Sequence, residues 1–503
     1  MRCPECDGIS YSRKTKTPEW RCRKCGHEWD IGPALNTSSS TIPVPRRPGV
    51  DNICQWEPQF VDSSLRCRRE VDSGHPHLCI LHLPDPNKSY ELFYRALGEK
   101  FVQDESNPQV REINLAGVVF IQMRRLVVAL GLTYRRKRLI PVGKEFDEKP
   151  VTKRVTFAEA TFLGDLEARP QIGGLQDCRS LVFNGMANFQ HAHFETNVDF
   201  MNVRFRAGVN FNDARFEGSA RFGFGDQNSG LPSWPHFPPP PTIDKATPAI
   251  FGRNTFFRRT RFEGSATFYG CQFNGVDFSE VRFSEGADFM GTEFNAKAIF
   301  KQANFEKGAR FGQGDVESFG VNGLFVGDAD FSGARFRGVA KFWGDIFHEG
   351  TNRVGSTAWQ FLTNGRWRWP DYRPGPFGGN ANFANARFDQ LAEFPGAHFA
   401  KRANFSNVKF PETEEFPGAD FRRVQFSGDA VFIGARFGVE YHFPGARFGG
   451  AAIFKGALFP KQKSDAFSPP FDDAQFKNKP DFGNYRLEGG YPLSGTPRNT
   501  RNQ

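Results

Sequence analysis

Phenylalanine recurs along most of this chain at intervals of five or six residues. The longest run begins at Phe383 and ends at Phe459, and most of its steps alternate between five and six. A small residue, usually Ala, stands two positions before each Phe, as in ANFANARFDQL and VNFNDARFEGS. Amphipathic helices need apolar steps of three and four, and half-buried strands need steps of two, so this spacing fits neither. It does fit a chain that turns a corner about every five residues.

The spacing predicts a coil with four short sides, each of which points a Phe and a small residue inward. Four sides close a coil of roughly 22 residues, and successive coils stack at strand spacing, about 4.8 Å. Unbroken spacing covers residues 183–222, 251–311, 325–347 and 383–459. Weaker matches lie at Leu115, Phe120, Phe157, Phe162, Phe471, Phe476 and Phe482. About 12 coils follow, or roughly 55–60 Å of rod.

These units resemble the pentapeptide repeat, in which Leu or Phe occupies the centre and Ala stands two positions before it. The resemblance implies a mainly β fold, a right-handed quadrilateral β-helix or solenoid. One coil cannot bury its own rings, so the stack should behave as one cooperative array with capped ends. Some members of the family imitate DNA and modulate a topoisomerase, gyrase, which requires a strongly acidic rod. This chain has 65 Lys and Arg against 56 Asp and Glu, so DNA mimicry is kept only as a further alternative.

Two CxxC motifs open the chain, Cys3 with Cys6 and, fifteen residues later, Cys22 with Cys25. Two such knuckles at this separation are typical of a four-thiolate zinc site, because each presents two thiolates to one tetrahedral ion. The arrangement resembles a zinc ribbon, with room for a β-hairpin between the knuckles. A disulfide pair is the alternative, which a cytosolic chain disfavours.

A second cysteine-rich group predicts a Cys3His site that could hold another zinc ion. Its members are Cys54, Cys67, Cys79 and His82. Two other histidines, His75 and His77, compete with His82 for the fourth position. Three buried thiols beside surface histidines are the alternative interpretation.

Composition divides the chain into six segments. We expect a zinc ribbon at 1–30, a Ser/Pro-rich linker at 31–50, the Cys3His module at 51–84, a capping helix region at 85–112, the β-helix at 113–482 and a disordered polar tail at 483–503. Apolar residues at steps of three, four and seven within 87–101 predict the helix. Insertions should interrupt the β-helix at 121–150, 225–248, 312–323 and 348–380.

The last insertion interleaves aromatic residues with arginine. Its notable side chains are Trp359, Arg366, Trp367, Arg368, Trp369 and Tyr372. Such a loop can stack on unpaired bases, or it can fold its aromatic rings back onto the rod.

The outward residue just before each Phe is basic on alternate sides and acidic or amide on the sides between. The basic positions are Arg204, Arg215, Arg261, Arg282, Arg335, Arg387 and Lys409. The acidic or amide positions are Asn188, Asp199, Asn210, Asp277, Asp288, Asp330, Asn382, Glu393 and Asn404. This predicts two basic and two acidic or amide stripes, which serve either solubility and charge pairing or recognition by a partner.

The sequence contains no GxSxG, HExxH or phosphate-binding Gly-Lys-Ser/Thr motif. Both predicted zinc sites have four protein ligands, which is typical of structural sites without an open position. We therefore expect a non-enzymatic scaffold whose N-terminal zinc modules dock a protein partner, with no small-molecule substrate.

Nucleic-acid binding through the basic ribbon is the alternative function. The residues that would contact phosphates are Arg13, Lys14, Lys16, Arg21, Arg23 and Lys24. The sequence starts without an apolar signal region, and its most apolar stretch is broken by two arginines, Arg124 and Arg125. A cytoplasmic protein without a membrane span is therefore expected.

Overall fold

The computed structural model of this chain contains two compact units, Met1–Asp51 and Asn52–Gln503. It describes residues 11–13, 19–22, 28–30, 53–62, 65–67, 69–71, 77–121, 151–164, 166–167, 181–201, 203–223, 249–312, 324–343, 360–361, 367–368, 376–411, 418–438, 441–459, 471 and 473–483. The expected linker at 31–50, most of the four insertions and all but the first residue of the expected tail lie outside these ranges.

The first unit contains a three-stranded antiparallel sheet in the order β1-β2-β3. Its strands are β1 (Tyr11–Arg13), β2 (Glu19–Cys22) and β3 (Glu28–Asp30). β1 and β2 form a hairpin at the place where the sequence leaves room for one between the two CxxC motifs. Trp20 in the central strand is paired with Trp29 in β3.

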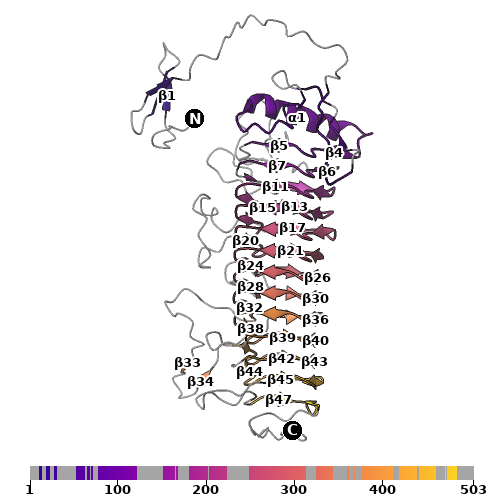
Figure 1. Ribbon diagram of the computed structural model, residues 1–503, viewed down its shortest axis with the longest axis vertical. Coiled ribbons are helices and arrows are strands. Elements are labelled where there is room, and N and C mark those ends of the chain that lie inside the picture. Colours follow the sequence, from indigo (N-terminus) through magenta and orange to yellow (C-terminus); the bar gives the residue numbers. More distant parts are fainter. Residues whose placement is uncertain are drawn as a thin grey trace, which may run out of the picture. The chain divides into compact units, whose positions relative to one another are not determined.

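The second unit begins with the Cys-rich segment and one helix, α1 (Tyr90–Ser106). Ser89 caps this helix, since its side chain accepts the amide hydrogen of Leu92, and a capped start of this kind stabilises the first turn. The helix predicted from the apolar spacing is therefore present, and it runs beyond 101. Phe93 is fully buried, and its ring meets Phe120 edge-on with centroids 6.0 Å apart. α1 lies next to the first strands of the repeat (Figure 1), and Phe93 packs against the first rings.

From residue 112 the chain forms four parallel sheets, which we call faces 1 to 4 in the order the chain visits them (Figure 1). Face 1 consists of β4 (Glu112–Asn114), β6 (Arg154–Thr156), β10 (Ala187–Asn188), β14 (Val209–Asn210), β18 (Thr255–Phe256), β22 (Val276–Asp277), β26 (Ala298–Ile299), β30 (Ala329–Asp330), β36 (Ala381–Asn382), β40 (Ala403–Asn404), β43 (Ala430–Val431) and β46 (Ala452–Ile453). Face 2 consists of β5 (Val119–Phe120), β7 (Thr161–Phe162), β11 (His193–Phe194), β15 (Arg215–Phe216), β19 (Arg261–Phe262), β23 (Arg282–Phe283), β27 (Asn304–Phe305), β31 (Arg335–Phe336) and β37 (Arg387–Phe388).

The other two sheets complete each coil. Face 3 consists of β8 (Leu166–Glu167), β12 (Val198–Asp199), β16 (Ala220–Arg221), β20 (Ala266–Thr267), β24 (Ala287–Met290), β28 (Ala309–Gly312), β32 (Ala340–Trp343), β38 (Ala392–Glu393), β41 (Ala419–Asp420) and β44 (Tyr441–His442). Face 4 consists of β9 (Leu181–Phe183), β13 (Val203–Phe205), β17 (Ile250–Phe251), β21 (Gln272–Phe273), β25 (Glu293–Phe294), β29 (Leu324–Phe325), β35 (Pro376–Phe377), β39 (His398–Phe399), β42 (Gln425–Phe426), β45 (Arg447–Phe448) and β47 (Gln475–Phe476). A four-faced stack of parallel strands is the quadrilateral β-helix predicted from the spacing.

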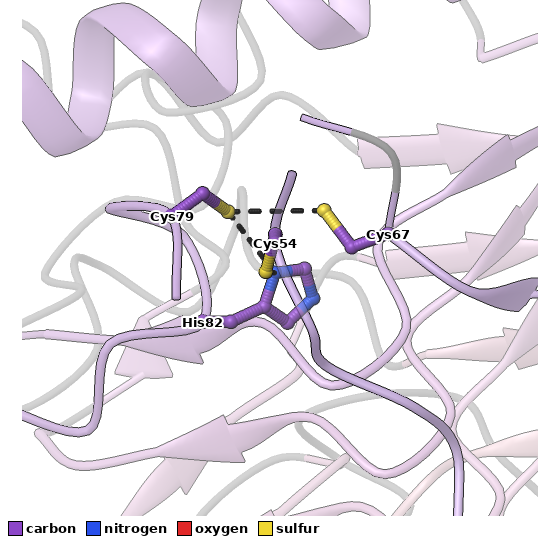
Figure 2. Close-up of side chains that lie close together, drawn as sticks. All are labelled: Cys54, Cys67, Cys79 and His82. Atoms are coloured by element: carbon purple, nitrogen blue, oxygen red, sulfur yellow. Dashed lines mark hydrogen bonds between the residues drawn. The ribbon is translucent and has the colours of Figure 1, made fainter. Parts of the chain in front are cut away.

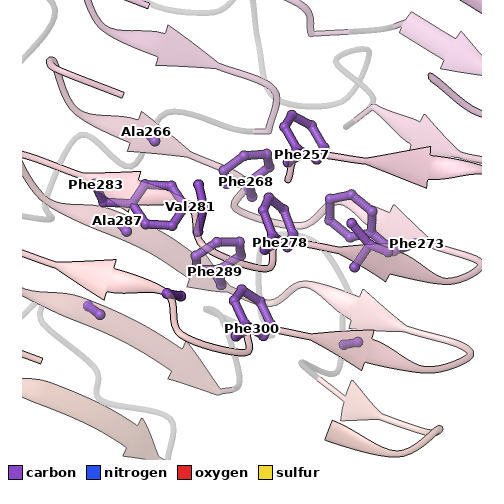
Figure 3. Packing of buried hydrophobic residues seen from close by; sticks show 14 of the residues in the cluster. Phe257, Ala266, Phe268, Phe273, Phe278, Val281, Phe283, Ala287, Phe289 and Phe300 are labelled. Carbon is purple, nitrogen blue, oxygen red and sulfur yellow. The ribbon is translucent and has the colours of Figure 1, made fainter. Parts of the chain in front are cut away.

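The register between coils places Phe directly over Phe on each face. In one coil, Phe273, Phe278, Phe283 and Phe289 come from faces 4, 1, 2 and 3, and all are buried (Figure 3). Phe278 stacks on its counterpart in the next coil, Phe300, with centroids 5.0 Å apart and planes 10° apart. Rings from opposite faces meet edge-on, as Phe278 of face 1 and Phe289 of face 3 do at 80°. The core is therefore four columns of stacked rings, a geometry that aromatic pairs favour.

Three of the expected insertions leave the stack at the same corner, between face 3 and face 4. The breaks in the described chain at this corner lie after β16, β28 and β32, and a fourth break at this corner follows β8. Strands β24, β28 and β32 next to it are longer than most, with four residues each. The insertion expected at 121–150 instead follows β5 and precedes β6.

Two details of the predicted repeat spacing are wrong. Phe377 falls inside the insertion expected at 348–380, but it is a core residue of face 4, stacked on Phe325 at 4.9 Å and on Phe399 at 4.7 Å. Phe410 and Phe421 occupy consecutive faces, so Phe416, which lies outside the described residues, is not needed as a repeat centre. In both places, the Phe that serves as the repeat centre is the one that aligns with the neighbouring coil, and its distance in sequence from the previous Phe does not identify it.

Candidate metal centre

Four side chains converge beside the first coil: Cys54, Cys67, Cys79 and His82 (Figure 2). Their potential ligand atoms all lie within 4.8 Å of one another, and Cys54, Cys79 and His82 are buried. The Sγ atoms of Cys67 and Cys79 are 3.8 Å apart, and His82 Nδ1 lies 3.6 Å from the sulfur of Cys54 and 3.2 Å from that of Cys79. Among the described residues, this is the one group of its kind.

These separations fit the edges of a tetrahedron around one zinc ion. With Zn–S near 2.3 Å and Zn–N near 2.0–2.1 Å, two sulfurs should lie about 3.8 Å apart and a sulfur and a nitrogen about 3.6 Å apart. A disulfide would instead bring two sulfurs to about 2.05 Å, and the three cysteines are free. The four residues therefore lie close enough to hold a metal ion, and three thiolates with one imidazole suit zinc.

Hydrogen bonds among the three thiols and His82 shift the pKa values of all four side chains. The hydrogen bond with Cys67 lowers the pKa of Cys54, and the same hydrogen bond raises the pKa of Cys67. At Cys79 the hydrogen bond with Cys54 raises the pKa, but those with Cys67 and His82 outweigh it and the pKa is lowered. Burial lowers the pKa of His82, yet its contacts with the thiols prevail and raise that pKa to about 9. A metal ion at Nδ1 would replace the proton that these thiols attract.

The second nitrogen of His82 fixes the orientation of its ring. Nε2 lies 2.9 Å from the carbonyl oxygen of Ala116, so it donates to that oxygen and leaves Nδ1 facing the thiols. The ring of Trp56 is stacked on the imidazole with centroids 4.7 Å apart. Ala116 belongs to the turn between β4 and β5, so the first coil of the repeat supplies the support that a metal-bound histidine needs.

The segment that carries Cys79 and His82 is also bonded to strand β5. The amide of Val119 donates to the carbonyl of Leu81 at 2.9 Å, just as Thr161 in the next coil donates to Val118. The ammonium group of Lys88 donates to the carbonyls of Leu83 at 2.8 Å and Val119 at 2.7 Å. Residues 79–83 therefore occupy the position of a preceding coil on face 2.

A strap formed by residues 59–61 extends from the Cys-rich segment across the second coil. The carboxylate of Glu159 accepts the amides of three successive residues, at 2.8 Å from residue 59, 2.6 Å from residue 60 and 3.0 Å from residue 61. The ring of Phe60 lies 4.9 Å from that of His191. Glu159 itself has a positive φ of 57°, at the corner between faces 1 and 2.

The structure places the predicted site residues in two different settings. Cys22, Arg13 and Arg21 lie in strands of the first unit. The other ribbon residues, Cys3, Cys6, Cys25, Lys14, Lys16, Arg23 and Lys24, lie outside the described residues, as does His75. His77 is described and exposed, and His82 is the histidine that joins the three thiols. The segment at 51–84 is bonded to the first coil, so it is part of the repeat unit and not a separate module.

The predicted charge stripes are only partly present. Face 2 is basic, with Arg215, Arg261, Arg282, Arg335, Arg387 and Lys409 before its Phe residues, but face 4 carries Arg204 beside Gln272, Glu293 and His398. On face 1 the polar side chains bond locally: Asp330 accepts the Ser332 amide at 3.0 Å and the Asn382 side chain at 3.0 Å. Most face 1 groups therefore stabilise turns and join coils.

Several residues that build the site were missed by sequence reasoning. Trp56, Lys88, Ala116 and Glu159 carry no metal-site signature, and each acts through a partner distant in sequence. The described helix α1 is not long and apolar enough to cross a membrane.

Comparisons with known proteins support the repeat. The family model for pentapeptide repeats (nine copies) matches residues 182–215, 249–292 and 415–458. These ranges include strands of all four faces. Neither a curated protein nor a solved structure matches the chain.

Proposed function

This chain is a pentapeptide-repeat protein, and we propose that it acts as a non-enzymatic scaffold whose zinc ribbon, residues 1–30, docks a protein partner. The ribbon would hold one zinc ion through Cys3, Cys6, Cys22 and Cys25, and Cys54, Cys67, Cys79 and His82 would hold a second. Four protein ligands leave no position on the ion for a reacting group, so both sites would be structural. Zinc would then stabilise the folded state at each of them.

The observation that carries this proposal is the division of the N-terminal region between two units. The sheet with Cys22 in its central strand belongs to a unit of its own, Met1–Asp51. The proposed second metal centre belongs to the repeat unit, where three of its four ligand residues are buried and His82 is bonded to the first coil. Because the second site is bonded to the first coil, we propose that the ribbon is the site that binds the protein partner.

The stack suits a passive structural role. Its interior is built on columns of Phe rings, and buried polar side chains beside them have partners, as Arg221 has in Asp199. Many of its outer carboxylates and amides are bonded to neighbouring turns. A surface hollow of about 510 Å³ between faces 4 and 1 is lined by Arg206, Ala207, Gly252, Arg253, Asn254 and Asn274. The side chains of this lining are guanidinium, amide and methyl groups.

Nucleic-acid binding through the ribbon is the second candidate. Arg13 is paired with Trp20, and Arg21 is paired with Ser12 and Glu28. The other four predicted contact residues lie outside the described residues, so this candidate rests on the basic composition of the ribbon. Topoisomerase modulation by DNA mimicry is weaker still, since the acidic side chains of face 1 are engaged in turns.

A reducing compartment suits these sites. Free thiols at Cys54, Cys67 and Cys79 and a buried thiol at Cys271 persist where disulfides do not form, so we propose the cytoplasm as the location.

Affinity purification of the full chain after nuclease treatment tests the docking function. A co-purifying protein would be isolated, and its binding to the purified chain measured at several salt concentrations. We expect Cys22→Ser to weaken binding at least about tenfold, about 1.4 kcal/mol, and Arg282→Gln on face 2 to leave it unchanged. Binding to labelled DNA that weakens steeply with salt and is lost in Cys22→Ser, without any protein partner, would instead establish the nucleic-acid alternative.

A further inference from the structure

We propose that the Cys54–Cys67–Cys79–His82 centre is a metal-operated cap of the β-helix. The bound ion would hold residues 79–83 in the position of a preceding coil, and loss of the ion would uncover the upper edge of strand β5. This inference concerns the second metal site alone and holds whether or not the ribbon docks a partner.

The first coil exposes polar backbone groups that a preceding coil would normally satisfy. On face 2, each amide before a Phe donates to the coil above, as Thr161 donates to Val118 and His193 donates to Ala160. The first such amide, that of Val119, has no coil above it and donates to Leu81. An unpaired strand edge is a site for pairing with another chain, so covering this edge has a clear benefit.

The groups that cover the edge lie next to the metal ligands. Leu81 stands between Cys79 and His82, and the Ala116 carbonyl accepts from His82 itself. A third contact comes from Asn114, whose side-chain amide donates to the carbonyl of Leu65, two residues before Cys67. Two ligand-bearing segments, that of Cys67 and that of Cys79 and His82, therefore contribute to one cover.

Few backbone hydrogen bonds join these segments to one another in the part of 53–83 that the structure describes, although Trp56 and Leu81 pack in the core and Arg66 is paired with Glu57. Among the described residues of 53–83, the regular backbone pairing is an isolated bridge between Ile53 and Glu70, with two further amide bonds, from Cys54 to Arg69 and from Gln55 to His77. Small irregular modules of this kind depend on a metal or disulfide for their stability. The ion would therefore decide whether the cover is ordered.

The remainder of the stack does not depend on the cap. Each lower coil is bonded to neighbours on both sides and contributes to continuous Phe columns. In stacked repeats, interactions are mainly between nearest neighbours, so opening at one end need not spread. Metal loss should therefore affect the first coil and leave the middle of the array unchanged.

Hydrogen exchange of the full chain tests the proposal. Exchange of amides in 113–120 would be compared with that in 298–311, first with zinc bound, then after chelation, then after zinc is restored. We expect chelation to accelerate exchange in 113–120 by about 100-fold or more, zinc to restore protection, and 298–311 to stay protected. Cys67→Ser should behave like the chelated chain, and Cys22→Ser, in the separate first unit, should keep 113–120 protected.

Two results would overturn the proposal. Unchanged protection of 113–120 in the chelated chain would mean that contacts such as those of Trp56 and Lys88 hold the cover without an ion. Simultaneous loss of protection in 113–120 and 298–311 would mean that the ion stabilises the whole array and is not an end cap. The chelated wild-type chain decides between these results even if Cys67→Ser fails to fold.

Discussion

The indole of Trp56 occupies the space beside Gly117 that any side chain at residue 117 would need. A Cβ atom at this position would lie 1.9 Å from Cε2 of Trp56. Gly117 also has a positive φ of 63°, which glycine adopts without the strain of other residues. Because Trp56 is stacked on His82, the packing of one glycine in the first coil reaches a metal ligand directly.

Gly117→Ala should destabilise the cap and weaken metal binding. The left-handed backbone alone costs about 1–2 kcal/mol for a residue with a Cβ, and the new methyl group must also displace Trp56 from His82. Competition with a zinc chelator, together with thermal melting, measures both effects. Gly456→Ala is the matched control, because it has a φ of 69° but its nearest neighbour is 3.9 Å from the added Cβ. Equal losses of zinc affinity in the two variants would contradict this account.

Phe405→Ala should cost about 3–5 kcal/mol, because the side chain is fully buried in the middle of a column. Its ring is stacked on Phe383 at 4.9 Å and on Phe432 at 5.0 Å. Phe482→Ala is the control, since that ring is partly exposed and, among the described rings, stacks only on Phe454, at 5.1 Å. Denaturant unfolding should show a clearly smaller loss for the control. A loss near zero at Phe405 would mean that the columns do not stabilise the stack.

The Phe spacing predicts the four-faced stack because every side of a coil has the same pattern, an inward Phe with a small residue two positions before it. It could not place Phe377, since the frame after a long insertion is set by stacking on Phe325 and not by counting from the previous Phe. The small residue two positions before each Phe is also predicted to point inward, and Cys271, two positions before Phe273, is buried. Outward residues were less predictable, because their partners lie in the next coil.

The metal-ligand set could be proposed from sequence, but its support could not. Cysteine spacing leaves the fourth ligand open among His75, His77 and His82, and only the fold brings His82 to the thiols. The hydrogen bond from His82 to Ala116 joins residues 34 apart in the chain. Nothing in the local sequence of Ala116 indicates such a role, so the integration of the site with the first coil required the structure.

The full chain should bind two zinc ions, and single substitutions should remove them independently. Cys22→Ser should release one equivalent and leave the repeat unit folded. Cys54→Ser should release the other and loosen the first coil, because Cys54 is a buried ligand of the capping site. Elemental analysis gives the stoichiometry, and circular dichroism melting follows the repeat. An unchanged metal content in Cys22→Ser would remove the ribbon assignment, and two ions retained in Cys54→Ser would remove the second site.

The carboxylate of Asp389 joins two coils on face 2, since it accepts from Arg335 at 2.9 Å and from Arg387 at 2.5 Å. Burial raises the pKa of Asp389, but hydrogen bonds with Arg387 and Arg335 outweigh burial, so that the pKa is lowered. A lowered folded-state pKa stabilises the protein above the unfolded value, about 3.9, and this contribution is lost as the pH falls through the folded value.

Asp389→Asn should therefore destabilise the chain at pH 7 by about 0.5–1 kcal/mol, the size typical of partly exposed pairs. The difference from the wild type should shrink as the pH falls below the unfolded value of about 3.9 and through the lowered folded pKa. Denaturant unfolding at several pH values measures this difference. Glu293→Gln on face 4 is the control, since that carboxylate accepts from the Gln272 side-chain amide at 3.2 Å, and its effect at pH 7 should be smaller. A deficit of Asp389→Asn that does not shrink at all as the pH falls from 7 through the acid range would show that the carboxylate acts through shape and not through charge.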